Sequence, residues 1–373
     1  MKKFCISLAL IFALFTLATC SKDIDDVCMF RGNTERTGVY NTIGPKELPE
    51  IKWKFKTDSS GSPVVCNGVV YIGGEDYFYA IKAKTGKEIW KFKVDDWIEY
   101  SPAIADGVVY FGGNDNDPYL YALDIRNGKE KWKFATSGGC IRSPAISDGV
   151  IYFGGRDNYL YAVDTKTGQQ KWKVRTGAPF VSSPSISDDV VFFGNRDGCL
   201  YAVDKKTGQE KWKFKVGKNI DSSPAIANGV VYIGCRDNYL YSVDANTGKQ
   251  KLKFKNYNWI ETSPSVKDSL VYFGGRCRDS RKNPYCLYAV DTSTGKEKWT
   301  FEVKYEIDSS PAIAGGVVYF SEGRIGPENY FYAVDSKTGQ EKWKYKTEGR
   351  CSTPVIADGV IYFSCGGYLY ALH

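Results

Sequence analysis

The feature that most constrains the fold is an internal repeat. A Ser-Pro or Thr-Pro pair opens eight successive units, whose prolines are Pro63, Pro102, Pro144, Pro184, Pro224, Pro264, Pro311 and Pro354. The seven intervals cover 354 − 63 = 291 residues, an average of about 42 residues per unit. A tandem repeat of this length indicates that each unit is one supersecondary element that stacks on its neighbours.

Each unit contains four short runs rich in β-forming residues. An apolar run after the proline is followed by runs such as Val108–Gly113, Tyr159–Asp164 and Lys171–Val174, and Asp-Gly or Thr-Gly turns separate them. Such runs predict four antiparallel strands. A unit of about 40 residues with four strands is typical of a propeller blade. The sequence therefore predicts an all-β fold, an eight-bladed β-propeller of four-stranded antiparallel blades.

The two ends of the repeat region complement each other. The eighth unit stops at Tyr368–Leu372 and lacks a fourth strand, whereas Ile51–Phe55 reads as a fourth strand with no unit before it. We expect this N-terminal strand to complete blade eight and close the ring, because closure removes the open sheet edges. The propeller domain is accordingly predicted to span 51–373.

Two further columns of the repeat have structural interpretations. The residue before each proline is always Ser or Thr, and its hydroxyl is expected to satisfy backbone groups near the axis. A polar ligand-binding ring is the alternative. The fourth strand carries a tryptophan in all units but the fifth, where Leu252 stands, and these side chains are expected to lock blade to blade. The tryptophans are Trp53, Trp90, Trp132, Trp172, Trp212, Trp299 and Trp343.

The combination Tyr-Leu-Tyr-Ala-(Val/Leu)-Asp, Thr-Gly turn and Trp resembles the PQQ-like, quinoprotein-type propeller repeats with their tryptophan-docking motif. The resemblance covers 51–373, and Phe30–Asn33 followed by Thr37-Gly38 is similar to the leader that precedes such propellers. It implies one of two functions. Family members are either quinoprotein dehydrogenases or non-enzymatic propellers, which include BamB-like outer-membrane-assembly lipoproteins.

The N-terminus reads as a targeting segment. Two lysines precede the apolar stretch Phe4–Ala18, so residues 1–19 are predicted to be a signal peptide. The stretch ends in Leu-Ala-Thr-Cys and resembles a lipobox, although Thr19 departs from the usual small residue. We expect lipidation of Cys20, a lipidated N-terminus and linker or leader over 20–50, and anchoring in the outer membrane of the cell envelope, on the periplasmic or the surface side. The alternative is ordinary secretion with an incidental cysteine.

The cysteines and the single histidine narrow the chemistry. Of the 11 Cys, nine remain once Cys5 and Cys20 are set aside, and an odd number outside the cytoplasm predicts disulfides and a free thiol. The predicted pairs are Cys277–Cys286 and Cys351–Cys365, while Cys28, Cys66, Cys140, Cys199 and Cys235 stay unassigned. The one histidine is the terminal His373, which excludes histidine-based catalysis and metal sites. A net charge of +7 from 50 basic and 43 acidic residues is not a nucleic-acid-binding composition.

One candidate binding site is the channel mouth. Three residues before the proline, four units carry an acid, namely Glu99, Asp221, Glu261 and Asp308. Trp97 and Trp259 stand two residues before Glu99 and Glu261, in blades two and six, which lie opposite each other in a ring of eight. Two such pairs would suit a cationic or sugar ligand. Loop packing is the alternative interpretation.

A second candidate is a basic arc on the turns between strands two and three. These turns carry arginines in four consecutive units, and Arg142 is added to the same candidate face. The arc residues are Arg156, Arg196, Arg236 and Arg276. An acidic protein partner or a polyanion is the expected ligand, and inter-blade ion pairing with turn-forming Asp residues is the alternative.

These observations favour a non-enzymatic envelope lipoprotein that acts as a protein-binding scaffold, with no catalytic, cofactor-binding or metal-binding residue. The resemblance suggests a role in outer-membrane protein assembly. One alternative is a carbohydrate-binding surface lipoprotein. Another is an oxidoreductase that uses PQQ with calcium, in which the four acids would lie near the quinone and Trp97 or Trp259 would stack on it.

Overall fold

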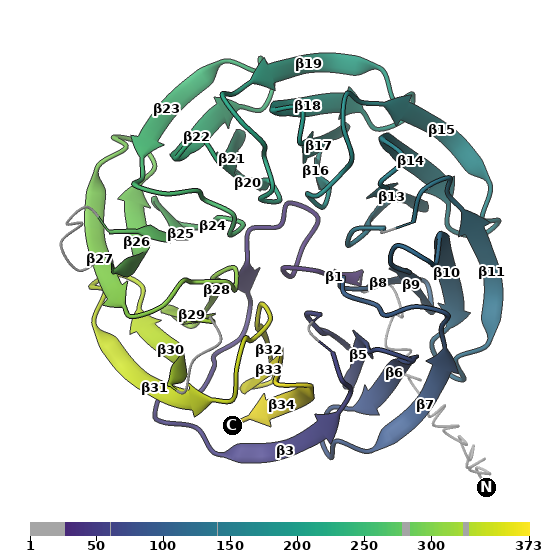
Figure 1. The fold of residues 1–373 in the computed structure, drawn as a ribbon, viewed down its shortest axis with the longest axis horizontal. Helices are drawn as coiled ribbons and strands as arrows, with labels where there is room; N and C mark the ends of the chain where they lie inside the picture. Colours follow the sequence, from purple (N-terminus) through teal and green to yellow (C-terminus); the bar gives the residue numbers. More distant parts are fainter. Residues whose placement is uncertain (1–26, 60, 140, 278–283, 324–327) are drawn as a thin grey trace, which may run out of the picture.

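The computed structural model describes residues 27–59, 61–139, 141–277, 284–323 and 328–373. Within these residues the chain forms 34 strands and no helix, and eight sheets surround a central axis (Figure 1). The all-β, eight-bladed propeller is thus confirmed. The predicted signal peptide and Cys20 lie outside the described residues. In the described part of the chain, no helix is long and apolar enough to cross a membrane.

Blades one to four each run from the innermost strand outward. Blade one contains β4 (Val64–Cys66), β5 (Val69–Gly73), β6 (Tyr77–Lys82) and β7 (Glu88–Lys93). Blade two contains β8 (Ala103–Ala105), β9 (Val108–Gly112), β10 (Tyr119–Asp124) and β11 (Glu130–Ala135). Blade three contains β12 (Ala145–Ser147), β13 (Val150–Gly154), β14 (Tyr159–Asp164) and β15 (Gln170–Arg175). Blade four contains β16 (Ser185–Ser187), β17 (Val190–Gly194), β18 (Cys199–Asp204) and β19 (Glu210–Lys215).

Blades five to eight follow the same order. Blade five contains β20 (Ala225–Ala227), β21 (Val230–Gly234), β22 (Tyr239–Asp244) and β23 (Gln250–Lys255). Blade six contains β24 (Ser265–Lys267), β25 (Leu270–Arg276), β26 (Tyr285–Asp291) and β27 (Glu297–Val303). Blade seven contains β28 (Ala312–Ala314), β29 (Val317–Ser321), β30 (Asn329–Asp335) and β31 (Glu341–Thr347). Blade eight contains β32 (Val355–Ala357), β33 (Val360–Cys365), β34 (Tyr368–Leu372) and β3 (Ile51–Lys56).

Blade eight shows how the ring closes. The N-terminal strand β3 pairs antiparallel with the C-terminal strand β34, with Ile51 opposite Leu372 and Lys56 opposite Tyr368. The backbone of Glu50 also exchanges two hydrogen bonds with that of His373. The first and last strands of the repeat region therefore pair in one blade, and the expected closure is found (Figure 1).

Tight turns and docked tryptophans explain why the repeat folds in this way. In blade three, Asp148 (φ 50°) and Gly149 (φ 70°) form a two-residue turn that requires left-handed backbone at both positions. The Trp132 Nε1 atom donates to the carbonyl of Thr165 in the next blade, and a Cβ on Gly168 would lie 2.8 Å from the Trp132 ring. The other six tryptophans donate to a backbone carbonyl in the same manner, onto Ala83, Ile125, Lys205, Ala245, Ser336 and Pro45.

Strand alternation gives the propeller two distinct ends. Turns between strands one and two and between strands three and four share one end, which we call the closed face. Loops between strands two and three, and from strand four to the next blade, share the other end, which we call the open face. The two ends differ because of the segment before the propeller, residues 27–50, which we call the leader.

The leader passes through the channel, contacts most inner strands and continues onto the closed face. Its strand β1 (Cys28–Met29) pairs with β8 of blade two, and β2 (Val39–Tyr40) runs parallel to β28 of blade seven. Between them, three leader carbonyls accept backbone N–H groups from blades four, five and six. Figure 1 shows this purple segment at the centre of the ring. The leader is therefore an integral part of the propeller.

Two arginines hold the leader in place. Arg31 and Arg36 are buried, with 1% and 0% of their surface exposed. The Arg36 guanidinium donates to the carbonyls of Ser143 (2.9 Å) and Phe30 (3.1 Å), and Arg31 donates to that of Pro264 (2.6 Å). Burial lowers the pKa of Arg31 to about 10 and that of Arg36 to about 9, and the neighbouring Arg31 charge adds to the effect on Arg36. Both side chains therefore stay charged at neutral pH.

Three disulfides are present among the described residues. The predicted pairs Cys277–Cys286 and Cys351–Cys365 are confirmed. The third pair, Cys28–Cys66, ties the leader to blade one and was not assigned from the sequence. Cys199 and Cys235 are buried free thiols. Cys140 lies outside the described residues.

Candidate binding face

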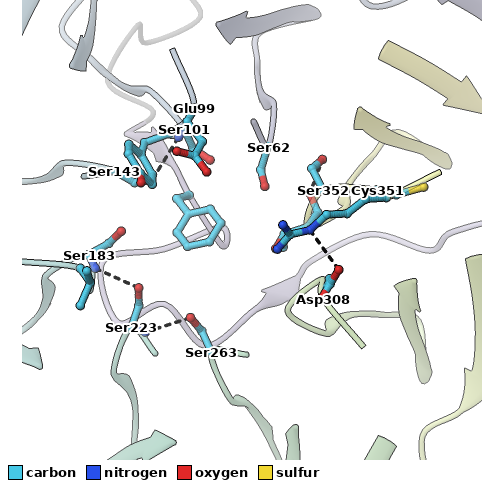
Figure 2. A pocket seen from close by; sticks show the side chains of 15 residues that line it. Ser62, Glu99, Ser101, Ser143, Ser183, Ser223, Ser263, Asp308, Cys351 and Ser352 are labelled. Carbon is cyan, nitrogen blue, oxygen red and sulfur yellow. Dashed lines mark hydrogen bonds and ion pairs between the residues drawn. The ribbon is translucent and has the colours of Figure 1, made fainter. Parts of the chain in front are cut away.

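The channel holds a polar cavity of about 230 Å³ that opens on the open face (Figure 2). Its wall is the ring of Ser and Thr residues that precede the prolines. The Ser183 N–H donates to the Ser223 hydroxyl (3.0 Å), and the Ser223 N–H donates to the Ser263 hydroxyl (2.9 Å). The expected structural role of these hydroxyls is thus confirmed, since they link the inner ends of successive blades.

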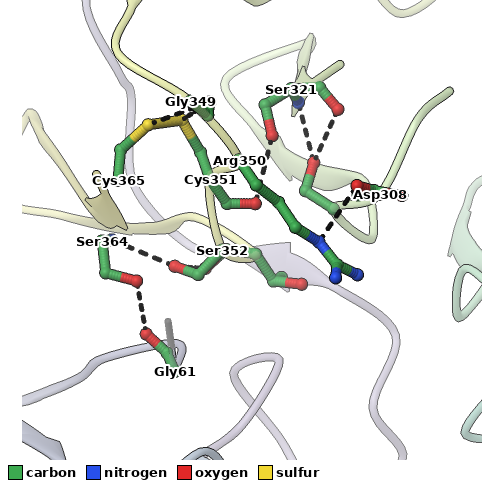
Figure 3. Close-up of a disulfide and its surroundings, with 11 residues drawn as sticks. Gly61, Asp308, Ser321, Gly349, Arg350, Cys351, Ser352, Ser364 and Cys365 are labelled. Carbon is green, nitrogen blue, oxygen red and sulfur yellow. Dashed lines mark hydrogen bonds and ion pairs between the residues drawn. A yellow bond between two sulfur atoms is a disulfide. The ribbon is translucent and has the colours of Figure 1, made fainter. Parts of the chain in front are cut away.

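Two of the four predicted acids, Glu99 and Asp308, line this cavity. Asp308 forms an ion pair with Arg350, whose Nε atom lies 3.0 Å from Oδ2 (Figure 3). The Arg350 side chain is 70% exposed and borders both the channel cavity and a neighbouring one. Sequence analysis did not select Arg350. It directly precedes Cys351 in the loop that leads into blade eight, a position where no other unit has an arginine.

The other two acids belong to a charge network on the open face. Asp221 lies 3.5 Å from Arg196 and 2.5 Å from Arg236, measured from carboxylate oxygen to Nε. Arg236 also donates to Glu261 at 2.8 Å. Burial raises the pKa of Glu261, while the Arg236 charge acts in the opposite direction. The four acids therefore do not converge on one point, and three of them are already paired with arginine.

The remaining residues of the basic arc also have partners within the protein. Arg156 pairs with Asp115 of the preceding blade, and the Arg276 guanidinium carbon lies 5.6 Å from the centre of the Tyr285 ring. The Asp residue that follows each of the first three arginines accepts a hydrogen bond from the hydroxyl of a tyrosine four residues later. Asp197, for example, accepts from Tyr201 at 2.6 Å. These contacts support the ion-pairing and turn-forming interpretation of the arc.

Arg142 lies deeper than the arc. It is buried, its guanidinium carbon sits 4.3 Å from the centre of the Tyr100 ring, and its Nε atom donates to the Phe180 carbonyl at 3.3 Å. Burial lowers its pKa to about 10, and the nearby Glu99 charge partly offsets this effect. Arg142 therefore joins the loops of neighbouring blades beneath the open face.

The two tryptophans are exposed, by 53% for Trp97 and 47% for Trp259. Their surroundings differ. Trp259 and Glu261 line a second cavity of about 130 Å³, and the Arg236 guanidinium stacks 4.7 Å from the Trp259 ring centre. Trp97 lines neither cavity, although Glu99 faces the channel. The two Trp-Glu pairs therefore do not form one symmetric site across the channel.

Comparison with known families decides the affiliation of the chain. A family model described as "Outer membrane protein assembly factor BamB" matches residues 48–146, 133–253, 196–281 and 280–373. The chain belongs to this family. None of the curated proteins compared with this BamB-family chain matches it significantly.

Solved structures share the fold of this BamB-family propeller at low sequence identity. BamB from Moraxella catarrhalis aligns with a TM-score of 0.75 at 17% identity, covering 87% of this chain and 100% of that one. A europium-containing methanol dehydrogenase aligns with a TM-score of 0.74 at 15% identity, covering 90% and 88%. The quinohemoprotein alcohol dehydrogenase from Comamonas testosteroni aligns with a TM-score of 0.74 at 16% identity, covering 92% and 80%. At these identities the likeness shows the fold alone.

The donor set of the channel does not fit the PQQ and calcium of the dehydrogenase branch. Calcium takes six to eight oxygen ligands, several of them carboxylates. The channel cavity offers Glu99 and Asp308, and Asp308 is bound by Arg350. Among the described residues, no group of three or more His, Cys, Asp or Glu side chains is arranged to hold a metal ion. The stacking position expected for Trp97 or Trp259 also lies outside this cavity.

Proposed function

We propose that the protein is a non-enzymatic, lipid-anchored scaffold of the cell envelope that binds a protein partner through its open face, in outer-membrane protein assembly. The observation that carries the proposal is the pair of exposed indole rings, Trp97 and Trp259, on a rim where Glu261 and Asp308 are already paired with arginine. Exposed aromatic residues beside arginine are the usual energetic centres of protein interfaces. Membership of the BamB family supports the assembly role.

Site-specific photocrosslinking in the native cell tests this proposal. A photoreactive residue replaces Trp97 or Trp259, and a matched control replaces Lys166, which is exposed on the closed face. We expect the two rim positions to crosslink to an outer-membrane assembly protein and position 166 not to do so. Identical products from all three positions, or no product from the rim, would contradict the proposal.

A carbohydrate ligand is the second candidate, because Trp97 presents an exposed ring next to Glu99. Sugars stack on such rings and donate hydroxyl hydrogen bonds to carboxylates. Titration of the purified protein with envelope oligosaccharides, followed by tryptophan fluorescence, separates the two functions. A saturable change that is lost in Trp97→Ala would favour the sugar. A parallel titration with PQQ and calcium addresses the enzymatic alternative, because a ligand specific to the folded state raises the Tm.

A further inference from the structure

The exposed large apolar side chains differ in kind between the two faces. Those on the open face are aromatic and lie in the loops between blades, namely Trp97, Tyr257 and Trp259. Those at the closed end are aliphatic. They are three leader residues and two residues at the closed-face ends of fourth strands, namely Val27, Ile43, Leu48, Ile51 and Ile89. Among them Ile43 and Leu48 are the most exposed, by 58% and 61%.

Local contacts place Ile43 and the segment before Leu48 on the closed face. The Cα atom of Ile43 lies 3.2 Å from the position that a Cβ of Gly315 would take, and Gly315 sits in the turn between strands one and two of blade seven. The Pro45 carbonyl accepts Trp343 Nε1 at 3.2 Å. In the other blades that carbonyl belongs to a turn between strands three and four. Residues 43–48 thus substitute for the turn that blade eight lacks and present two aliphatic side chains to solvent.

The chain enters the propeller at this same face. Val27 precedes Cys28, and the Cys28–Cys66 disulfide fixes that point beside Asn67 and Gly68, the closed-face turn of blade one. Cys20 lies seven residues before Val27, and seven residues span at most about 25 Å. The route from an inner strand around the rim to the open face crosses about 15 Å of sheet and about 20 Å of strand length, which is about 35 Å. A membrane anchor at Cys20 therefore holds the closed face toward the lipid.

We propose that the closed face docks on the bilayer surface, with Ile43 and Leu48 inserted among the lipid headgroups and the open face directed away from the membrane. The tether part of this inference rests on the proposed lipid anchor at Cys20, whereas the contact itself belongs to described residues. Aliphatic side chains that enter the interface add to the affinity of an acyl chain. The exposed residues between the two aliphatic side chains, Lys46 and Glu47, carry opposite charges, so the proposed contact is chiefly apolar.

Lipid crosslinking of the full-length, lipidated protein tests the orientation. The protein is reconstituted in vesicles of phosphatidylethanolamine and phosphatidylglycerol with a photoreactive residue at position 43, 48, 97 or 259. We expect lipid adducts from positions 43 and 48 and none from positions 97 and 259. Adducts from the rim positions, or none from the leader positions, would overturn the proposal.

A second measurement separates the face contact from the anchor. The mature Cys20→Ala protein, residues 20–373, carries neither the predicted signal peptide nor an acylated cysteine, and it is mixed with the same vesicles. We expect weak binding that falls by about tenfold when Ile43→Ser and Leu48→Ser are added, and that changes less than about twofold with Trp97→Ser and Trp259→Ser, while all variants keep the same Tm. Absent vesicle binding, or equal loss in both double variants, would refute the contact. Partner crosslinking from the rim is a separate readout, so failure of either proposal can be recognised.

Discussion

The inside of the channel and the rim of the open face use charge in different ways. Inside the channel, the buried Arg31 and Arg36 of the leader donate to backbone carbonyls of blades that are far apart in the sequence. At the open face, arginines such as Arg350 pair with carboxylates while their own side chains stay largely exposed. A charge enclosed by protein is costly to leave unpaired, whereas an exposed ion pair contributes little. The difference teaches that the leader inside the channel maintains the ring and that the rim of the open face can change without unfolding it.

Replacement of Arg36 should cause the largest loss of folding stability. A small loss would contradict this comparison. Arg36→Ala leaves the carbonyls of Phe30, Ser143 and Pro184 without their donor inside the protein. We expect a loss of about 3–5 kcal/mol in the free energy of unfolding. Chemical denaturation provides the measurement, and Arg350→Ala is the matched control at the open face. The control should lose less than about 1 kcal/mol, and similar losses in both variants would contradict the distinction.

The disulfides at the two ends should follow the same order with a smaller difference. Cys28–Cys66 closes a separation of 38 residues at the closed face, and Cys351–Cys365 closes one of 14 at the channel mouth. The loop-entropy relation gives about 4 kcal/mol for the first and about 3 kcal/mol for the second. Denaturation of the two double Cys→Ser variants under identical conditions checks this order. A larger loss from the channel-mouth pair would mean that the leader is not a principal restraint.

Acid should weaken the closed face first. A backbone hydrogen bond from Thr167 lowers the pKa of Asp164 to about 2, and a bond from Thr207 lowers that of Asp204. Their folded-state pKa lies below the unfolded value of about 4, so the stability they contribute is present above pH 4 and is lost as the pH falls to about 2. Burial raises the pKa of Glu261 on the open face, so its protonation favours the folded state.

Urea denaturation between pH 6 and pH 2.5 measures this loss. The double variant Asp164→Asn and Asp204→Asn should start less stable and lose less on acidification, because two of the titrating groups are gone. Glu261→Gln is the control, and it should not reduce the acid-induced loss. An unchanged pH profile in the double Asn variant would show that these turns do not control acid stability.

The parts of the structure that could be predicted from sequence are those that repeat. Eight aligned units reveal which position holds a turn, a docked indole or an inner-ring hydroxyl, and the missing fourth strand of blade eight identifies β3 as its complement. Register also explains the cysteine pairs: Cys351 and Cys365 form a bridge across neighbouring segments, and Cys277 and Cys286 flank the blade-six loop. Because the units repeat, contacts between distant residues can be predicted by comparing equivalent positions in neighbouring units.

Features that occur once could not be predicted in this way. The leader has no second copy to align, so the contacts of Arg31 and Arg36 with several inner strands, and the Cys28–Cys66 link, were not visible in the pattern. The asymmetry of the two Trp-Glu pairs has a simpler cause. The turn beside Trp259 supplies Arg236 as a stacking partner, whereas the matching turn of blade one carries Glu75 and Asp76. Side-chain partners contributed by a neighbouring turn decide such differences.

The smallest stability effect should come from the residues with the largest proposed functional effect. Trp97→Ala and Trp259→Ala remove side chains that are about half exposed. We expect Trp97→Ala to lower the free energy of unfolding by less than about 0.5 kcal/mol. Trp259→Ala should lower it slightly more, because this side chain also contacts Arg236. Partner capture by the purified variants should nevertheless weaken by about tenfold or more. If the substitutions destabilise the protein as strongly as Arg36→Ala, the rim tryptophans serve the fold, and the separation of a structural leader from a recognising open face is wrong.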